Sequence, residues 1–221
     1  MEYILIYSVI CLVSAALLLT LGVLSLVHYK STPSSKPFGM LAFFSAIYVF
    51  GYAFEIMKGE PSWVLFWLKV EYLGIPFLSA CLLWLSLEFT GKFKNIRPQL
   101  LVLLFVISVF FLIAFHTNSI HHSYYTSIEI NDSGPFQTAK LGRGFFYIAH
   151  SSWLICSLII SAVLYVLHLI KTASIFKKQT LIMLMGAVWS LIGFVIYLSG
   201  IVPGDLDINP IVITIDICIF A

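Results

Sequence analysis

The sequence predicts an all-α membrane protein, a bundle of seven transmembrane helices. Of the 221 residues, 61% are hydrophobic and only 10% are charged, and the mean hydropathy is +1.03. A soluble domain of this length needs far more polar surface to cover its core. The lipid bilayer is therefore the first expected partner, and we expect no binding to nucleic acid.

The number of helices follows from apolar runs that are separated by short polar loops. Each spanning helix needs roughly 20 apolar residues. The runs cover residues 3–28, 38–57, 63–90, 99–116, 144–170, 180–200 and 210–221. Together they fill the chain, so residues 1–221 form one transmembrane domain.

The first and last runs need separate interpretation. Run 3–28 is too long for a signal peptide and has no basic residues before it, so we expect a membrane helix. The last run, 210–221, would form only roughly 18 Å of helix against a hydrocarbon core of about 30 Å. A helix that stops inside the bilayer leaves unpaired carbonyl groups. We therefore expect a truncated seventh helix that continues beyond residue 221.

The orientation follows from the distribution of charge. Alternate loops, the first, third and fifth, hold eight of the twelve basic residues and no acidic residue. These eight are Lys30, Lys36, Lys92, Lys94, Arg97, Lys171, Lys177 and Lys178. Because basic loops stay in the cytoplasm, we expect the N-terminus outside and the C-terminus in the cytoplasm.

Polar residues within the spans gather in the outer third of the bilayer. Such groups are costly in lipid and usually mark a functional site. The candidate ligand-binding residues are Glu55, Glu71, Tyr72, His150, Asp207, Asn209 and, in the outer loop, His121. Their common depth predicts a polar cavity that opens to the outside, although a buried hydrogen bond that only joins helices explains Glu71 equally well.

The third span, which includes "FWLKVEYLGIPF", carries two charges and a proline. Lys69 and Glu71 are two residues apart, so they lie on nearly opposite faces of a helix. We expect Lys69 to extend its ammonium group to the interface and Glu71 to face inward. Pro76 cannot donate to the carbonyl of Tyr72, which predicts a kink.

The long outer loop, residues 117–142, contains His121 and His122. No cysteine or further histidine stands at the spacing of a metal site, so we expect no metal there. The four cysteines, Cys11, Cys81, Cys156 and Cys218, lie in apolar runs and indicate no disulfide framework.

The start of the seventh helix suggests a movable element. Pro210 suits the first turn of a helix, and Asn209 is best placed to cap that helix. Asp216 lies about 9 Å further along. We expect Pro76, Pro210 and Asp216 to take part in signalling, with Asp216 distinguishing two helix positions or, equally, only bonding a neighbouring helix.

Several segments resemble the N-terminal seven-helix region of membrane-bound histidine kinases and some diguanylate cyclases. The resemblance covers nearly the whole chain. It rests on "YAFEIM", "FWLKVEYLGIPF", "WLSLEFTGK", "TNSIHHSYY", "FFYIAHSSWLICSL" and "IYLSGIVPGDLDINPIVI".

The resemblance implies the sensory input region of a bacterial two-component kinase in the plasma membrane. It implies cytoplasmic output domains after residue 221, most simply a kinase and otherwise a cyclase, so this fragment itself has no catalytic residues. We expect a small or amphipathic ligand of unknown identity and a homodimer in the full-length protein.

Two other classes remain open. A small transporter or channel is the main alternative, but transporters often show broken helices in matching halves, and Pro76 has no counterpart in spans five to seven. A cofactor protein would need a retinal lysine in the seventh span, which is absent there, or a haem between His116 and His150. We expect no cofactor.

Overall fold

The computed structural model describes residues 2–28, 32–57, 60–92, 97–131, 138–202 and 206–221. These residues form nine helices and one hairpin. In chain order they are α1 (Glu2–Val27), α2 (Ser35–Glu55), α3 (Pro61–Glu71), α4 (Ile75–Thr90), α5 (Arg97–His116), α6 (Asn118–His121), β1 (Tyr125–Asn131), β2 (Thr138–Arg143), α7 (Phe145–Lys171), α8 (Ser174–Ser199) and α9 (Asn209–Phe220).

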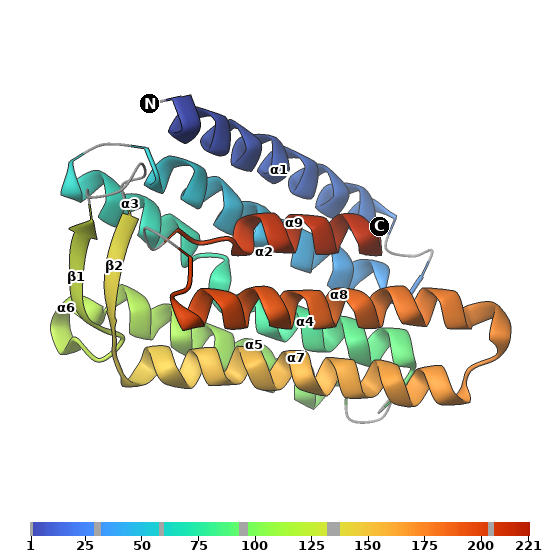
Figure 1. Ribbon diagram of the computed structural model, residues 1–221. Coiled ribbons are helices and arrows are strands. Elements are labelled where there is room, and N and C mark those ends of the chain that lie inside the picture. The colour runs from blue at the N-terminus through green and yellow to red at the C-terminus, as the bar shows by residue number, and fades with distance from the viewer. Residues whose placement is uncertain (1, 29–31, 58–59, 93–96, 132–137, 203–205) are drawn as a thin grey trace.

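The long helices lie side by side as a bundle (Figure 1). Six segments are long and apolar enough to cross a membrane: Tyr3–Val27, Ser35–Glu55, Pro61–Thr90, Pro98–His116, Phe145–Lys171 and Ser174–Ser199. The seventh expected span corresponds to α9, a shorter apolar helix of 12 residues. The start of α1, the hairpin and the start of α9 lie at one end of the bundle, and the turn between α7 and α8 lies at the other (Figure 1).

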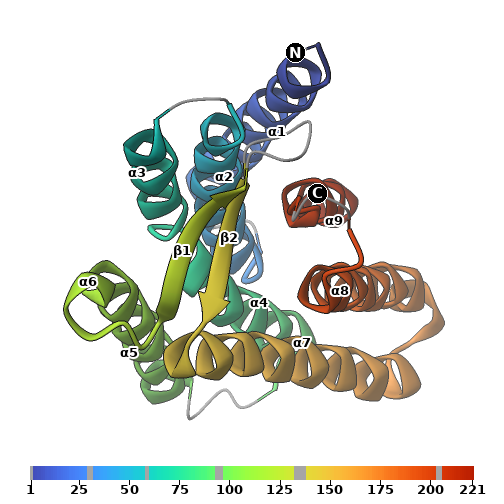
Figure 2. The same cartoon turned by 60° about the vertical axis from the view of Figure 1, so that its left-hand side comes forward.

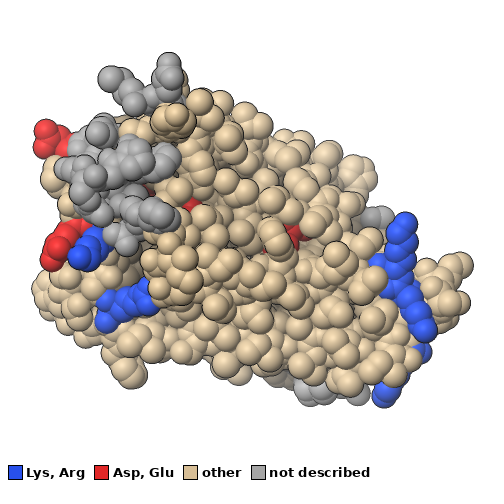
Figure 3. Space-filling model, in the orientation of Figure 1, with Lys and Arg blue, Asp and Glu red and all other residues tan. Residues whose placement is uncertain are grey.

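The outer surface of the bundle is apolar. Large apolar side chains remain exposed on several helices, among them Val13 of α1, Val102 of α5 and Met185 of α8. Lysine and arginine side chains gather at the two ends of the visible face, and an almost uncharged band separates them (Figure 3). Such a band is the surface expected of a protein that is surrounded by lipid.

Helix α2 is the centre of the bundle, because it contacts α1, α3, α4 and α9. Its small and aromatic side chains form much of the main core, including Ala42, Val49 and Tyr52, which are at most 4% exposed. Residues from α1, α4, α7, α8 and α9 complete this core. Helix α9 packs mainly against α8 and also contacts α1 and α2.

The third span is broken rather than merely kinked. Helix α3 ends at Glu71, and α4 begins at Ile75 with Pro76 in its first turn. In the turn between them, the N–H groups of Leu73 and Gly74 donate to the carbonyls of Val70 and Glu71, at 3.0 and 2.9 Å. The predicted position of the irregularity is correct, and its extent is larger because the proline starts a new helix.

Gly74 lets this turn lie directly on the backbone of α2. A Cβ atom at Gly74 would lie 2.3 Å from the carbonyl oxygen of Phe44 and 3.2 Å from the amide nitrogen of Tyr48. We expect Gly74→Ala to lower the free energy of unfolding by about 1–3 kcal/mol, because backbone atoms cannot yield as a flexible side chain can. Thermal unfolding in lipid nanodiscs measures the loss. Leu73→Ala, at an exposed position of the same turn, is the control, and equal effects of the two variants would contradict this account.

The long loop of residues 117–142 contains a β-hairpin that the all-α prediction missed. Strands β1 and β2 pair antiparallel, with Glu129 opposite Lys140 and a register irregularity between Tyr125 and Ile128. The hairpin crosses the end of the bundle from the side of α3 to the start of α7 (Figure 2). It therefore lies across the ends of helices that are distant in sequence.

Candidate functional site

A cavity of about 100 Å³ lies among α2, α4, α7, α8 and α9. Most of its polar lining residues sit toward the hairpin end of their helices, whereas Ser190 and most of the apolar ones lie deeper. The polar residues are Tyr48, Tyr72, Tyr147, His150, Ser151, Ser190, Tyr197, Asp207 and Asn209. The apolar residues include Leu78, Leu82, Leu154, Leu158, Val212 and Ile213. Such a lining suits a small molecule with one polar end and one apolar end.

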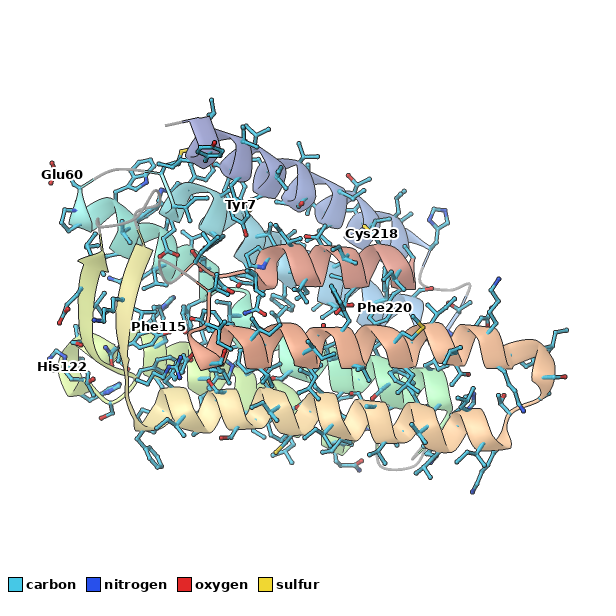
Figure 4. All side chains as sticks on the ribbon, in the orientation of Figure 1. Tyr7, Glu60, Phe115, His122, Cys218 and Phe220 are labelled. Carbon is cyan, nitrogen blue, oxygen red and sulfur yellow. The ribbon has the colours of Figure 1, made fainter. Side chains whose placement is uncertain are left out.

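Asp207 joins this cavity to the start of α9. Its carboxylate accepts a hydrogen bond from the hydroxyl of Tyr48. Its backbone carbonyl accepts one from Tyr7 at 3.1 Å, and its backbone N–H donates to the hydroxyl of Tyr52 at 2.8 Å. Tyr7 lies on α1 close to the level of the start of α9 (Figure 4). Three tyrosines of α1 and α2 thus hold the segment that leads into α9.

Asn209 does not cap α9, so that prediction is wrong. The helix begins at Asn209 itself, the preceding residue is Ile208, and no side-chain cap is formed there. Instead, the backbone N–H and the side-chain amide of Asn209 donate to Asp207 Oδ1, at 2.9 and 2.8 Å. Pro210 does occupy the first turn, as predicted.

The environment of Asp207 also changes its protonation. Burial raises the pKa of its carboxyl group to about 6, because the charged form loses hydration. The hydrogen bonds from Tyr48 and Asn209 act in the opposite direction, since they favour the carboxylate. The carboxyl group at the start of α9 can therefore change charge near physiological pH.

A cluster of aromatic rings forms the hairpin end of the cavity. The hydroxyls of Tyr72 and Tyr125 are hydrogen-bonded, and Tyr124 bonds Nδ1 of His150 at 2.6 Å. The ring of Tyr72 stacks on Phe115 with centroids 3.6 Å apart. Phe115 lies beside the hairpin at the end of α5 (Figure 4). The hairpin thus places its two tyrosines against two predicted site residues, Tyr72 and His150.

Asn118 fixes the chain that carries these tyrosines. Its Oδ1 accepts from the backbone N–H groups of Tyr124 and Tyr125, at 2.9 and 3.1 Å. Its Nδ2 donates to the carbonyl of Tyr125 at 2.9 Å. In the sequence, Asn118 is only one residue of the segment "TNSIHHSYY", and no local pattern indicates its three backbone contacts.

His121 lies away from the residues that line the cavity. It is half-buried, and its ring bonds the carbonyl of Ala114 at 3.0 Å and the N–H of Ser123 at 2.9 Å. These contacts hold the turn that leads into the hairpin. Within the described part of the chain, His121 therefore stabilises this turn and does not line the cavity.

Glu55 and Glu71 face one another beneath the hairpin. They are 5% and 3% exposed, and their carboxyl groups are hydrogen-bonded to each other. The backbone N–H of Ala139 in β2 also bonds the carboxyl group of Glu55. Lys69 is exposed, which confirms that it and Glu71 lie on opposite faces of α3. Neither glutamate is among the residues that line the cavity.

Nearly the whole chain matches one known protein family. Residues 10–221 match the family described as the N-terminal 7TM region of histidine kinase. The chain belongs to this family. Comparison with curated proteins finds no match. Membership gives this histidine kinase 7TM region a sensory input role, makes it a multi-pass membrane protein, and means that it is not itself the catalytic part.

Asp216 of this 7TM region bonds the neighbouring helix. Its Oδ2 accepts from the hydroxyl of Ser190 in α8, whereas its buried Oδ1 has no hydrogen-bond partner in the described part of the chain. Ser190 also lines the cavity. This bond therefore links the deeper part of the cavity to the middle of α9.

The 7TM region shows no cluster of three or more metal-ligating side chains among its described residues. Its four cysteines are free, with Cys11 and Cys81 buried. The tyrosines at positions 7, 48, 52, 147 and 197 were missed by sequence reasoning. Each sits in an apolar run, where a tyrosine is an ordinary core residue and gives no separate signal.

Proposed function

We propose that this region is the sensory input of a bacterial two-component histidine kinase and that the cavity is its signal-binding site. The signal is a small molecule with a hydrogen-bonding group and a short apolar part, reaching the cavity from outside the cell or from the membrane. The observation that supports this most directly is the polarity of the cavity, with tyrosines, His150 and Asp207 toward the hairpin and leucines below.

The charge distribution supports an orientation with the hairpin outside. The positive-inside rule places the turn between α7 and α8 in the cytoplasm, together with the basic residues near it, Lys171, Lys177 and Lys178. The hairpin lies at the opposite end of the bundle (Figure 1). In this orientation, the N-terminus is outside and α9 runs toward the cytoplasm.

Helix α9 is the proposed signalling element. Its first residues, Asn209, Val212 and Ile213, line the cavity, and Asp216 is held by Ser190, another cavity residue. A ligand that contacts these residues in one helix position more than in another shifts the population of positions. In a homodimer of the kinase, a tilt or slide of α9 in each protomer passes that shift to the cytoplasmic kinase.

Filling the cavity tests the proposal without a known ligand. Ser151 lies on the cavity wall in α7 and is 9% exposed. We expect Ser151→Phe to change autophosphorylation of the full-length kinase in proteoliposomes at least about fivefold, the lower end of usual coupling between sites. Disulfide crosslinking between engineered cysteines along α9 of two protomers should change with it.

The matched control is Ile148→Phe, which adds a ring to the same helix at a position that is 57% exposed. This variant should keep the activity and the crosslinking of the wild type. A folded Ser151→Phe kinase with unchanged activity would refute a role for the cavity. Changed activity with an unchanged crosslinking pattern would refute movement of α9.

A further inference from the structure

The paired carboxyl groups of Glu55 and Glu71 form a second buried site, separate from the residues that line the cavity. Glu55 ends α2 and Glu71 ends α3, and both are at least nine-tenths buried. Their side chains are hydrogen-bonded to each other, and Glu71 Oε1 has no hydrogen-bond partner in the part of the chain that the structure describes. The pair is therefore a buried contact between two carboxyl groups.

The ligand that this geometry fits is the proton. Two carboxyl groups can hydrogen-bond each other only when one of them carries a proton, because each carboxylate is solely an acceptor. A fully ionised pair would place two like charges in a buried site. The hydrogen-bonded arrangement is thus the proton-bound state of the pair.

No positively charged side chain among the described neighbours can take the place of that proton. The titratable neighbours that act on it are Asp207 before α9, Cys11 of α1, Tyr48 and Tyr52 of α2, and Tyr125 of β1. None of these is basic, and Lys69 lies on the exposed face of α3. Among the described residues, the pair therefore has no cation that would hold both glutamates ionised.

Close packing leaves the pair no room to separate. Gly51 lies against Glu71 so closely that an added Cβ would be 2.6 Å from Glu71 Cγ and 3.2 Å from the carbonyl oxygen of Trp67. The hairpin is attached at the same place, since Ala139 donates to Glu55 and Tyr125 bonds Tyr72, the residue after Glu71. Repulsion within the pair must consequently move the end of α3 or the hairpin.

We propose that Glu55 and Glu71 form a proton-binding site that couples the proton concentration outside the cell to the position of the hairpin. When the pair loses its proton to solvent, the two carboxylates repel, and the contact of Ala139 with Glu55 changes. The hairpin then shifts relative to α2 and α3. This site is distinct from the cavity, because neither glutamate lines the cavity.

Infrared spectroscopy of the chain in nanodiscs tests the bound proton directly. A protonated carboxyl group has a carbonyl stretching band that a carboxylate lacks. At neutral pH, we expect that band in the wild-type spectrum after subtraction of the spectrum of the Glu55→Gln/Glu71→Gln double variant. Glu60→Gln, at an exposed position just before α3, should leave the band unchanged. A difference spectrum without the band would overturn the proposal.

Fluorescence of the hairpin tests the coupling and does not depend on the double variant. An environment-sensitive dye on Ile128→Cys in β1, with the exposed Cys156 and Cys218 changed to serine, should report a transition as the pH rises. In Glu71→Gln, whose amide can still donate to Glu55, we expect that transition to be lost and the low-pH signal to persist. The proposal would be overturned if no transition occurred with the wild-type glutamates, or if the transition persisted in Glu71→Gln. Loss of the transition in Asp207→Asn alone would also overturn it.

Discussion

Replacement of Asn118 by alanine is expected to lower the free energy of unfolding by about 3 kcal/mol or more. The side chain is 8% exposed and makes hydrogen bonds to two backbone N–H groups and one carbonyl, all of Tyr124 and Tyr125. Each buried polar group that loses its partner costs roughly 1–3 kcal/mol. Thermal unfolding and SDS titration of the chain in lipid bicelles measure the loss.

Two variants distinguish the loss of the Asn118 hydrogen bonds from a loss of stability that any substitution in this segment would cause. Asn118→Asp keeps the acceptor for both N–H groups and loses only the donor to the carbonyl of Tyr125, so a smaller loss is expected. Ser119→Ala changes an exposed neighbour and should stay within about 0.5 kcal/mol of the wild type. A loss for Asn118→Ala no greater than that of Ser119→Ala would contradict the role of the asparagine.

The consequences of Asn118 extend to the cavity. The tyrosines that it positions bond His150 and Tyr72, and both of these residues line the cavity. A stabilising residue before the hairpin therefore also shapes the polar end of the candidate binding site. We infer that variants here change signalling even though Asn118 is absent from the cavity lining.

Local properties of the sequence were enough for the helices and for the face on which Glu71 lies. The length of an apolar run sets a span, and a helical period of 3.6 residues separates Lys69 from Glu71. Both features involve residues close together in the chain. The irregularity before Pro76 is local in the same way, since it depends on a missing N–H group and the preceding turn.

The cavity and the Asp207 network depend on contacts that no local pattern contains. Tyr48 and Tyr7 reach Asp207 across 159 and 200 positions of the chain. Periodicity shows which face of a helix is apolar, but it does not show which other helix covers that face. The role of these tyrosines consequently could not be predicted from the sequence, because it depends on how α1, α2 and the start of α9 pack together.

Two errors arose where a nearby part of the chain supplied a hydrogen-bond partner that the sequence interpretation did not consider. Asn209 has the composition of a helix cap, yet Asp207 accepts both its backbone and side-chain N–H groups. The segment around Ile128 has alternating polar and apolar residues suited to a strand, but it was interpreted as a loop. In both cases, the partner that decided the structure lies outside the residue pattern that was used.

Asp207 should make the stability of the protein depend on pH in a defined direction. Burial raises the pKa of its carboxyl group in the folded protein from 3.8 to about 6. Because the folded-state value is the higher one, the stabilising contribution is fully present below about pH 4 and is lost as the pH rises to about 6. At roughly 1.4 kcal/mol for each pKa unit, the loss is at most about 3 kcal/mol.

The measurement compares the wild type with Asp207→Asn from about pH 4 to about pH 8. Asparagine stays neutral and can still bond Tyr48 and Asn209. The variant should therefore become more stable relative to the wild type as the pH rises. The gain should come almost wholly between about pH 4 and about pH 6, where Asp207 is ionised in the unfolded chain but still largely protonated in the folded protein. Glu129→Gln, an exposed acidic position in β1, should run parallel to the wild type throughout. If the difference between Asp207→Asn and the wild type did not change with pH, Asp207 would be ionised at no added cost, and the charge at the start of α9 would not respond to its surroundings.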